Sequence, residues 1–275
     1  MWSLDFNIKR QMERGYHVAM APTVANTKTG WYELHSSLPE DASYFIWGNS
    51  YRQYYRYLVD IGIGAIGSEE VIAENIMCGQ HENSYGYHVP EYFHIPIPVK
   101  AGTRISSRCQ VSSVSASANM GSNLMWGVAG GFDDASKYVG ISKCITLGAV
   151  TGSTNGTSVD PGGVANTYGS WVQFTSGLDY NLRGLSFRVG PYDTDIGVSA
   201  NWLMQIGIGG SGVEEPIVDY FYVRQAASSK RHAENNIIPM FPFQIPASTR
   251  IAVRARCSMT DSTDRIGKVT LHGWY

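Results

Sequence analysis

The sequence predicts an all-β protein built from two tandem antiparallel β-sandwiches of the jelly-roll kind. Three observations predict this fold: an internal repeat, apolar residues that alternate with period two, and turns rich in Gly, Pro, Asn and Ser. Each copy spans roughly 130 residues, more than the roughly 100 of an immunoglobulin-like domain, and has no Cys…Trp…Cys pattern. We therefore favour a jelly roll. The best helical candidate is residues 9–16, where Gly15 limits the helix.

The repeat consists of four matches that occur in the same order in both halves of the chain. They are Val24-Ala-Asn-Thr27 with 164–167, Ile61-Gly-Ile-Gly64 with 206–209, Glu69-Glu70 with 214–215, and Thr103-Arg-Ile105 with 249–251. The offset grows from 140 to 146 residues along the chain. An ancestral unit that was duplicated and then changed by small loop insertions explains this pattern.

The repeat divides the chain into four parts. We expect an N-terminal arm at residues 1–23, a first sandwich at 24–148, a linker at 149–163 and a second sandwich at 164–275. The linker is rich in Gly, Ser, Thr, Asn and Pro, which favour turns. Two long copies do not make a solenoid, because a solenoid needs three or more short repeats.

Period two is clearest in matched segments of the two copies. In residues 57–63 the odd-numbered positions are apolar, and in residues 202–208 the even-numbered positions are, so each segment predicts a half-buried strand. Near the end of each copy, arginines alternate with small apolar residues: Arg104 and Arg108 in the first, Arg250, Arg254 and Arg256 in the second. We expect the arginines to face water or a partner.

Several patterns resemble catalytic or cofactor motifs without the required context. Residues 62–67 and 207–212 both fit G-x-G-x-x-G, but the sequences that follow do not predict the helix that a dinucleotide site needs, so we interpret both as turns. Glu69-Glu70 and Glu214-Glu215 are adjacent pairs whose members point to opposite faces of a strand, and we interpret them as solvated turn carboxylates. The loose group His81, His88 and His94 matches no metal-ligand spacing.

Composition excludes several further classes of function. The net charge of −2 argues against a nucleic-acid-binding protein, which needs an excess of Lys and Arg. No apolar run approaches the roughly 20 residues that cross a bilayer, so we expect no membrane association. The cysteines, Cys78, Cys109, Cys144 and Cys257, lie far apart, which predicts free thiols in the core and no zinc site. We expect no metal and no cofactor.

Two segments are candidate protein interfaces. In the arm, Trp2, Leu4, Phe6 and Ile8 alternate with polar residues and predict a strand outside the repeat. This strand either closes an edge of its own domain or adds to the sheet of a neighbour.

The second candidate interface contains Arg52, Tyr54 and Arg56 in a tyrosine-rich stretch. Arginine and tyrosine are enriched at protein contacts, and we favour protein over nucleic acid as the partner because of the net charge.

The motif set also resembles a known group of proteins. Ile-Gly-Ile-Gly followed by Glu, the stretches Ile95-Pro-Ile-Pro98 and Phe243-Gln-Ile-Pro246, and the Thr-Arg-Ile-x-x-Arg strands resemble virion structural proteins of tailed bacteriophages. This resemblance covers most of both copies and implies jelly-roll proteins that decorate or cement heads, or that lie in tails and baseplates. The resemblance implies no active-site residues for this chain.

On these grounds we expect a non-enzymatic virion structural protein that is assembled in the host cytoplasm, most simply a capsid decoration or cement protein. Its partners would be the major capsid protein or tail components. We also expect a homo-oligomer, with a trimer the first choice, because two similar domains offer pseudo-equivalent surfaces. The rival is a tail, baseplate or adhesin protein that binds host carbohydrate through exposed Tyr and Trp. An enzyme ranks third.

Overall fold

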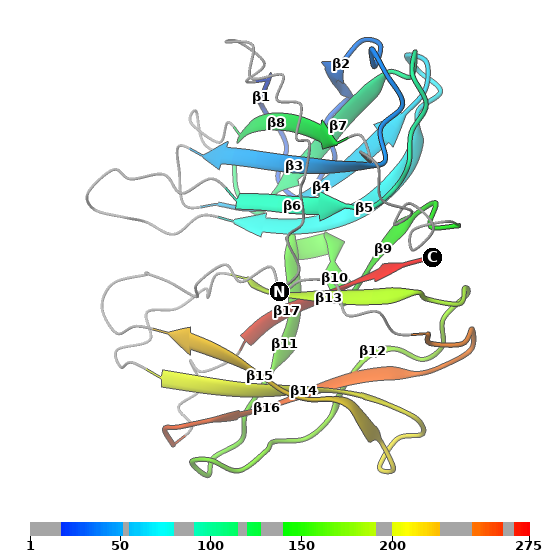
Figure 1. The fold of residues 1–275 in the computed structure, drawn as a ribbon. Coiled ribbons are helices and arrows are strands. Elements are labelled where there is room, and N and C mark those ends of the chain that lie inside the picture. Colours follow the sequence, from blue (N-terminus) through cyan, green and yellow to red (C-terminus); the bar gives the residue numbers. More distant parts are fainter. Residues whose placement is uncertain are drawn as a thin grey trace, which may run out of the picture.

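The computed structural model describes residues 18–51, 55–79, 91–114, 120–127, 140–190, 200–225, 244–260 and 267–275, and these form an all-β fold (Figure 1). Within these ranges the one helical element is the short 3-10 helix η2 (Thr151–Ser153). The strand pairings are antiparallel, apart from one parallel contact between Ala73 and Cys144. The predicted fold class is confirmed, whereas the helical candidate at residues 9–16 lies outside the described residues.

The first eight strands are paired like a long hairpin that folds back on itself. They are β1 (Val18–Met20), β2 (Tyr32–His35), β3 (Tyr44–Tyr51), β4 (Arg56–Ile63), β5 (Glu70–Gly79), β6 (Glu91–Ile95), β7 (Ile105–Val111) and β8 (Met120–Gly127). β1 pairs with β8, β2 with β7, β3 with β6 and β4 with β5. The resulting sheet orders, β1-β8-β3-β6 and β2-β7-β4-β5, are those of a jelly roll.

The second half of the chain repeats this order. Its strands are β11 (Asn155–Val159), β12 (Val172–Thr175), β13 (Gly184–Gly190), β14 (Ala200–Ile208), β15 (Glu215–Gln225), β16 (Ile251–Cys257) and β17 (Gly267–Trp274). β11 pairs with β17, β12 with β16 and β14 with β15. β4 lies between β5 and β7, and β14 lies likewise between β15 and β16. We refer to the two halves as the first and second jelly roll.

Local contacts also recur at matched positions. Trp31 lies over Gly62 in the first jelly roll, and Trp171 lies over Gly207 in the second. Asn26 and Asn166 both have positive φ, and each donates its backbone N–H to the last residue of β7 or β16. This recurrence is what a duplication predicts, and we propose an internal duplication as its origin.

The tryptophan contacts make a testable prediction. A Cβ built at Gly62 or Gly207 would lie 2.7 Å from the tryptophan ring above it, so Gly62→Ala and Gly207→Ala are each expected to lower the free energy of unfolding by about 1–3 kcal/mol. Gly30→Ala, where a Cβ meets nothing within 4 Å, is the matched control and is expected to change stability by less than about 0.5 kcal/mol. Urea denaturation measures all three, and unequal effects at Gly62 and Gly207 would contradict their equivalence.

A shared sheet joins the two jelly rolls. The short strand β9 (Cys144–Leu147) pairs with residues 271–274 of β17, while β11 pairs with residues 267–269 of the same strand. The other edge of β9 meets β5 of the first jelly roll. Residues 149–163, the expected linker, include β10 (Ala149–Val150), η2 and β11. This stretch therefore belongs to the sheet, a feature that its turn-rich composition did not indicate.

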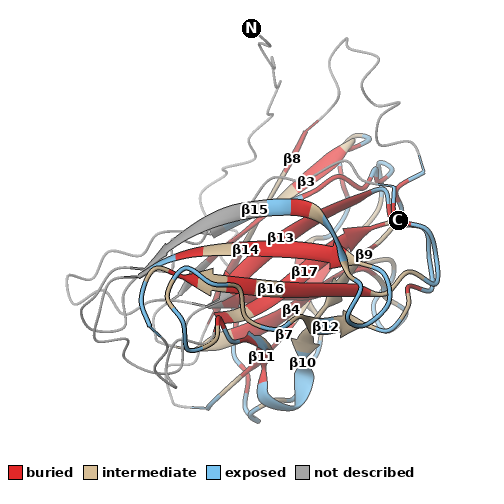
Figure 2. Ribbon diagram, turned by 90° about the horizontal axis from the view of Figure 1, so that it is seen from below, coloured by how far each residue is buried: buried red, intermediate tan, exposed pale blue. Residues whose placement is uncertain are grey.

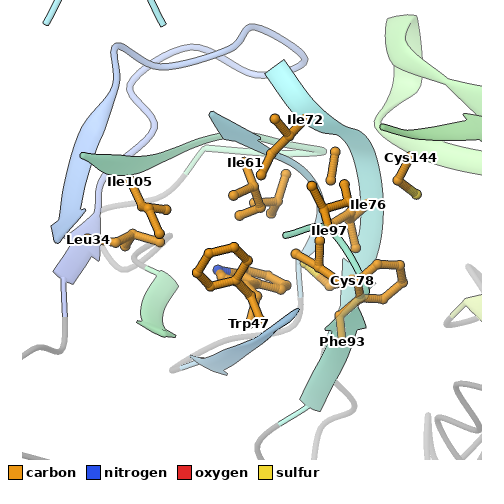
Figure 3. Packing of buried hydrophobic residues seen from close by; sticks show 14 of the residues in the cluster. Leu34, Trp47, Ile61, Ile72, Ile76, Cys78, Phe93, Ile97, Ile105 and Cys144 are labelled. Carbon is orange, nitrogen blue, oxygen red and sulfur yellow. The ribbon is translucent and has the colours of Figure 1, made fainter. Parts of the chain in front are cut away.

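Two clusters of buried apolar side chains form the cores. The first contains Trp47, Tyr57 and Ile61, and the second contains Trp202, Phe187 and Met204. Figure 2 shows the central strands largely buried and the turns exposed, and Figure 3 shows side chains of the first cluster converging between its sheets, with Cys144 approaching from β9. The predicted alternation in β4 and β14 is confirmed, because their apolar positions point into these cores. The prediction that β4 is half-buried was wrong, because Leu58 and Asp60 on its other face are 0% and 1% exposed.

Candidate assembly surface

The predicted interface residues lie mostly outside the part of the chain that the structure describes. Trp2, Leu4, Phe6, Ile8, Arg52 and Tyr54 belong to that group. Arg56 is described: it begins β4 and is half-buried, and burial lowers the pKa of its guanidinium. Its charge adds to the effect of burial in lowering the pKa of Lys268, which lies on β17. Arg56 therefore lies near the other jelly roll of its own chain.

A buried carboxylate organises the outer face of the first jelly roll. Asp60 of β4 is 1% exposed and accepts hydrogen bonds from Lys28 Nζ at 2.7 Å, Arg108 Nε at 2.8 Å and the backbone N–H of Asn75 at 2.8 Å. Asn75 has φ 51° and lies where the register between β4 and β5 shifts, so Asp60 satisfies an N–H that the bulge removes from the ladder. With these donors in place, Asp60 has a structural role.

Neutral and aromatic groups occupy the corresponding place in the second jelly roll. Tyr168 and Gln205 stand at the positions of Lys28 and Asp60. The guanidinium of Arg254 lies 4.7 Å from the ring centroid of Tyr168 and 4.3 Å from that of Trp171, and its Nε donates to Gln205 Oε1 at 2.6 Å. Arg256 lies over Tyr168 at 5.1 Å. The result is a half-exposed stack of arginine and aromatic rings.

The paired glutamates differ from their prediction in one respect. Glu69 and Glu214 are not solvated: their side chains are 3% and 2% exposed, and they pair with Arg104 at 2.9 Å and Arg250 at 2.8 Å. Burial raises the pKa of both carboxyls, but hydrogen bonds from their own backbone N–H, the arginine and a turn glycine bring each pKa below its usual value. In each copy, the turn brings the carboxylate of Glu69 or Glu214 against the arginine of the same jelly roll. The residue types alone did not predict this contact.

The glycine motifs also form turns, as expected. In each copy two of the motif glycines have positive φ, and the chain continues directly into β5 or β15. A strand cannot present a helix N-terminus to a pyrophosphate. The prediction that these motifs do not form dinucleotide sites is therefore supported by their geometry.

Sequence reasoning also missed the contact between the two jelly rolls. We define the seam as the contact of β9 and residues 271–274 of β17 with β5 and β6. Along it, Lys143 Nζ lies 3.0 Å from Glu70 Oε1, Cys144 pairs in parallel with Ala73, and Thr146 Oγ1 donates to the backbone oxygen of Glu74 at 2.6 Å. β9 is thus hydrogen-bonded to both jelly rolls.

His272 lies buried at the centre of the seam. Its Nδ1 is 2.8 Å from Thr146 Oγ1, and because that hydroxyl donates its proton to Glu74, Nδ1–H must be the donor to Thr146. The Phe93 ring of β6 meets the imidazole edge-on, with centroids 4.8 Å apart. Burial, reinforced by the positive charge of Arg188, lowers the pKa of His272 to about 3. The imidazole is therefore neutral at physiological pH.

A second contact joins residues 148–154, the segment between β9 and β11, to the first jelly roll. Gln110 Nε2 of β7 donates to the backbone oxygen of Thr151 at 2.7 Å and to Thr154 Oγ1 at 2.8 Å. Thr154 Oγ1 in turn donates to Asn26 Oδ1 at 2.8 Å. Thr154 is fully buried and has φ 49°, so this turn is firmly held. Together with the seam, it gives the two jelly rolls a second set of hydrogen bonds to each other.

Among the described residues, no group of three or more His, Cys, Asp or Glu side chains is placed to hold a metal ion. The four cysteines are free and buried, as predicted. In the same parts of the chain, none of the helical structure is long and apolar enough to span a bilayer. Comparison with known families finds no family model that matches the chain, and comparison with curated proteins finds no match.

Proposed function

We propose that this chain is a non-enzymatic virion structural protein of a tailed phage, acting as a capsid decoration or cement protein that docks on the particle and stabilises it. The observation that carries the proposal is the seam, because β9 pairs with a strand of each jelly roll, β17 and β5. Two jelly rolls that already share hydrogen bonds are ordered relative to each other before they dock across lattice subunits, which lowers the entropic cost of docking. The resemblance of its motifs to phage virion proteins supports the same proposal.

The disposition of charged side chains also supports a structural role. Asp60, Glu69 and Glu214 are buried carboxylates, and each is engaged by a cation and by backbone N–H groups. A general acid or base needs a free face toward a substrate. These groups hold strands and turns in place instead.

The test is the copy number of the protein in purified particles, measured by quantitative mass spectrometry against the major capsid protein. Hundreds of copies per particle are expected for a decoration protein, and particles lacking it are expected to lose their genome at a lower temperature. A few to a few tens of copies would move the proposal to the tail or baseplate. Particles that contain none of the protein would overturn it.

A second candidate, binding of host carbohydrate, is favoured by the stack of Tyr168, Arg254 and Trp171. Aromatic rings beside guanidinium donors are suited to sugars, although here Arg254 already covers part of both ring faces. Tyr168→Lys, which introduces the residue that the first jelly roll has at this position, is the discriminating variant. Glycan-array binding that this variant loses would favour the adhesin function, and no binding by either protein would dismiss it.

A further inference from the structure

The outer face of the first jelly roll carries a docking site that the chain itself occupies. Gln110 of β7 donates from Nε2 to the backbone oxygen of Thr151 at 2.7 Å and to Thr154 Oγ1 at 2.8 Å. Thr154 Oγ1 donates to Asn26 Oδ1 at 2.8 Å. The turn at residues 151–154 covers this part of the face, and Gln110 is therefore only 2% exposed. Two polar side chains of the first jelly roll thus bind a turn of polypeptide.

The second jelly roll presents the matched position with less cover. The strand registers of β7 and β16 make Arg256 the counterpart of Gln110, and Asn166 is the counterpart of Asn26. Arg256 is half-buried and Asn166 is exposed. Within the described ranges, the side chain of Arg256 hydrogen-bonds only to the backbone oxygen of Asn166, at 3.4 Å. The described part of the chain therefore supplies no turn that binds here as residues 151–154 bind the first jelly roll.

The charges at the two matched sites also differ. In the first jelly roll, the carboxylate of Asp60 pairs with two cations. In the second, Gln205 replaces Asp60, and Arg256 adds a second guanidinium beside Arg254. Asp219 accepts from Gln205 Nε2 at 3.0 Å, but neither arginine forms an ion pair with any described residue. The second site therefore has two cations without the paired anion that the first site contains.

Aromatic rings hold these two guanidiniums in position. They lie 4.7 and 5.1 Å from the ring centroid of Tyr168, and that of Arg254 lies 4.3 Å from the centroid of Trp171. A guanidinium that stacks through its face keeps its N–H edge available for hydrogen bonds. Nε of Arg254 and Nη1 of Arg256 donate to protein oxygens, and the other N–H groups of both side chains have no partner among the described residues. Donors fixed in this way lose little freedom when they bind a ligand.

We propose that Tyr168, Arg254 and Arg256 bind an acidic peptide segment of a partner protein, with carboxylates on residues two positions apart. Arg254 and Arg256 are themselves two residues apart on β16, so they project from one face about 6.6 Å apart along the strand. Alternate side chains of an extended peptide have the same spacing. Each guanidinium can bind a carboxylate through two parallel hydrogen bonds.

Two observations favour a peptide over a sugar as the ligand. The matched site of the first jelly roll binds a polypeptide turn. In the second jelly roll, Arg254 already covers part of the faces of Tyr168 and Trp171 on which a sugar ring would stack. The groups that stay available are the guanidinium edges, which recognise an anion.

The main experiment measures binding of the full chain to a short synthetic peptide in which Asp alternates with Ser, by isothermal titration calorimetry at low salt. A peptide in which Asn replaces Asp is the neutral control and is expected to bind at least tenfold more weakly. Arg256→Gln introduces the residue of the matched position and is expected to weaken binding of the Asp peptide at least tenfold. Lys100→Gln removes an equal charge from an exposed side chain of the first jelly roll and is expected to change the affinity less than twofold. Equal affinities of Arg256→Gln and the wild type, or no binding by the wild type, would overturn the proposal.

Arginine modification tests the same surface without a substitution. Phenylglyoxal reacts with accessible guanidinium groups, and mass spectrometry locates the modified residues. We expect the Asp peptide to protect Arg254 and Arg256 of the wild-type chain, while Arg108, the matched arginine of the first jelly roll, reacts at the same rate with and without the peptide. Equal protection of all three would contradict a specific site. Protection by an oligosaccharide of uronic acids but not by the Asp peptide would assign the surface to an acidic sugar and overturn the proposal.

This inference goes beyond the proposed function, because the peptide experiments need no particle. A protein that binds the Asp peptide but is absent from purified particles would keep the inference and remove the proposed function. A protein that is abundant in particles but does not bind the peptide would overturn the inference alone.

Discussion

Replacing Asp60 with alanine is expected to lower the free energy of unfolding by about 3–5 kcal/mol, since it removes the common partner of two cations and a buried N–H. Lys28 and the backbone of Asn75 lose their bonds at 2.7 and 2.8 Å. Burial already lowers the pKa of Lys28, against the opposing effect of Asp60. Because Lys28 and Arg108 are 19% and 33% exposed and can be partly hydrated, we expect a value near 3 kcal/mol, measured by urea denaturation.

The second jelly roll supplies the control for this substitution. Gln205 occupies the matched position, donates to Asp219 Oδ1 at 3.0 Å and accepts from Arg254. Gln205→Ala is expected to cost about 1–2 kcal/mol, because a neutral acceptor is lost and Arg254 keeps its aromatic neighbours. Equal effects of the two substitutions would contradict the role that we assign to the Asp60 charge.

Acidification from pH 7 to pH 5 is expected to lower the free energy of unfolding by about 2 kcal/mol through His272 alone. The folded pKa of His272 is depressed to about 3 from an ordinary 6.5. The unfolded chain therefore takes up a proton below pH 6.5 that the folded chain refuses until about pH 3. The contribution of His272 to the free energy of unfolding is fully present above pH 6.5. It decreases by about 1.4 kcal/mol per pH unit between pH 6.5 and about pH 3. A proton on Nε2 would find no acceptor among the described residues.

His272→Asn isolates this contribution, since its side-chain amide can replace Nδ1–H as donor to Thr146 but does not titrate. Denaturant unfolding at pH 7, 6 and 5 should show a smaller loss of stability in the variant than in the wild type, by about 2 kcal/mol over this range. The variant is less stable at every pH because a cavity remains, so the slope and not the absolute value is the measurement. Parallel slopes for the two proteins would show that His272 does not cause the acid sensitivity.

Patterns of a few consecutive residues correctly predicted the features that depend on those residues alone. Alternation identified β4 and β14, because neighbouring side chains on any strand face opposite sides. The glycine motifs were interpreted as turns from the residues that follow them. Both inferences depend on a few consecutive residues, and short-range periodicity is the main signal of secondary structure in a sequence. The expectation that the arginines face water or a partner was wrong for Arg104 and Arg250, whose side chains are 12% and 13% exposed and pair with Glu69 and Glu214.

The seam could not be predicted in this way, because its contacts join distant residues. β9 has only four residues and no clear alternation, yet Leu147 pairs with Leu271, and Cys144 pairs with both Ala73 and Trp274. Asp60 was likewise overlooked, since a single acid between Val59 and Ile61 gives no sign of cations that approach from residues 28 and 108. The repeat held one usable signal: Lys28 and Asp60 change together to Tyr168 and Gln205.

The position of Trp274 makes the core of the first jelly roll depend on a strand of the second. This residue is near the end of the last strand but is 1% exposed within the core of the first jelly roll, where its ring lies 5.7 Å from that of Phe93. During synthesis, the N-terminal half therefore waits for the final strand before its core is complete. We infer that neither half is an independent folding unit, that unfolding occurs in one transition, and that such long-range closure makes folding slow.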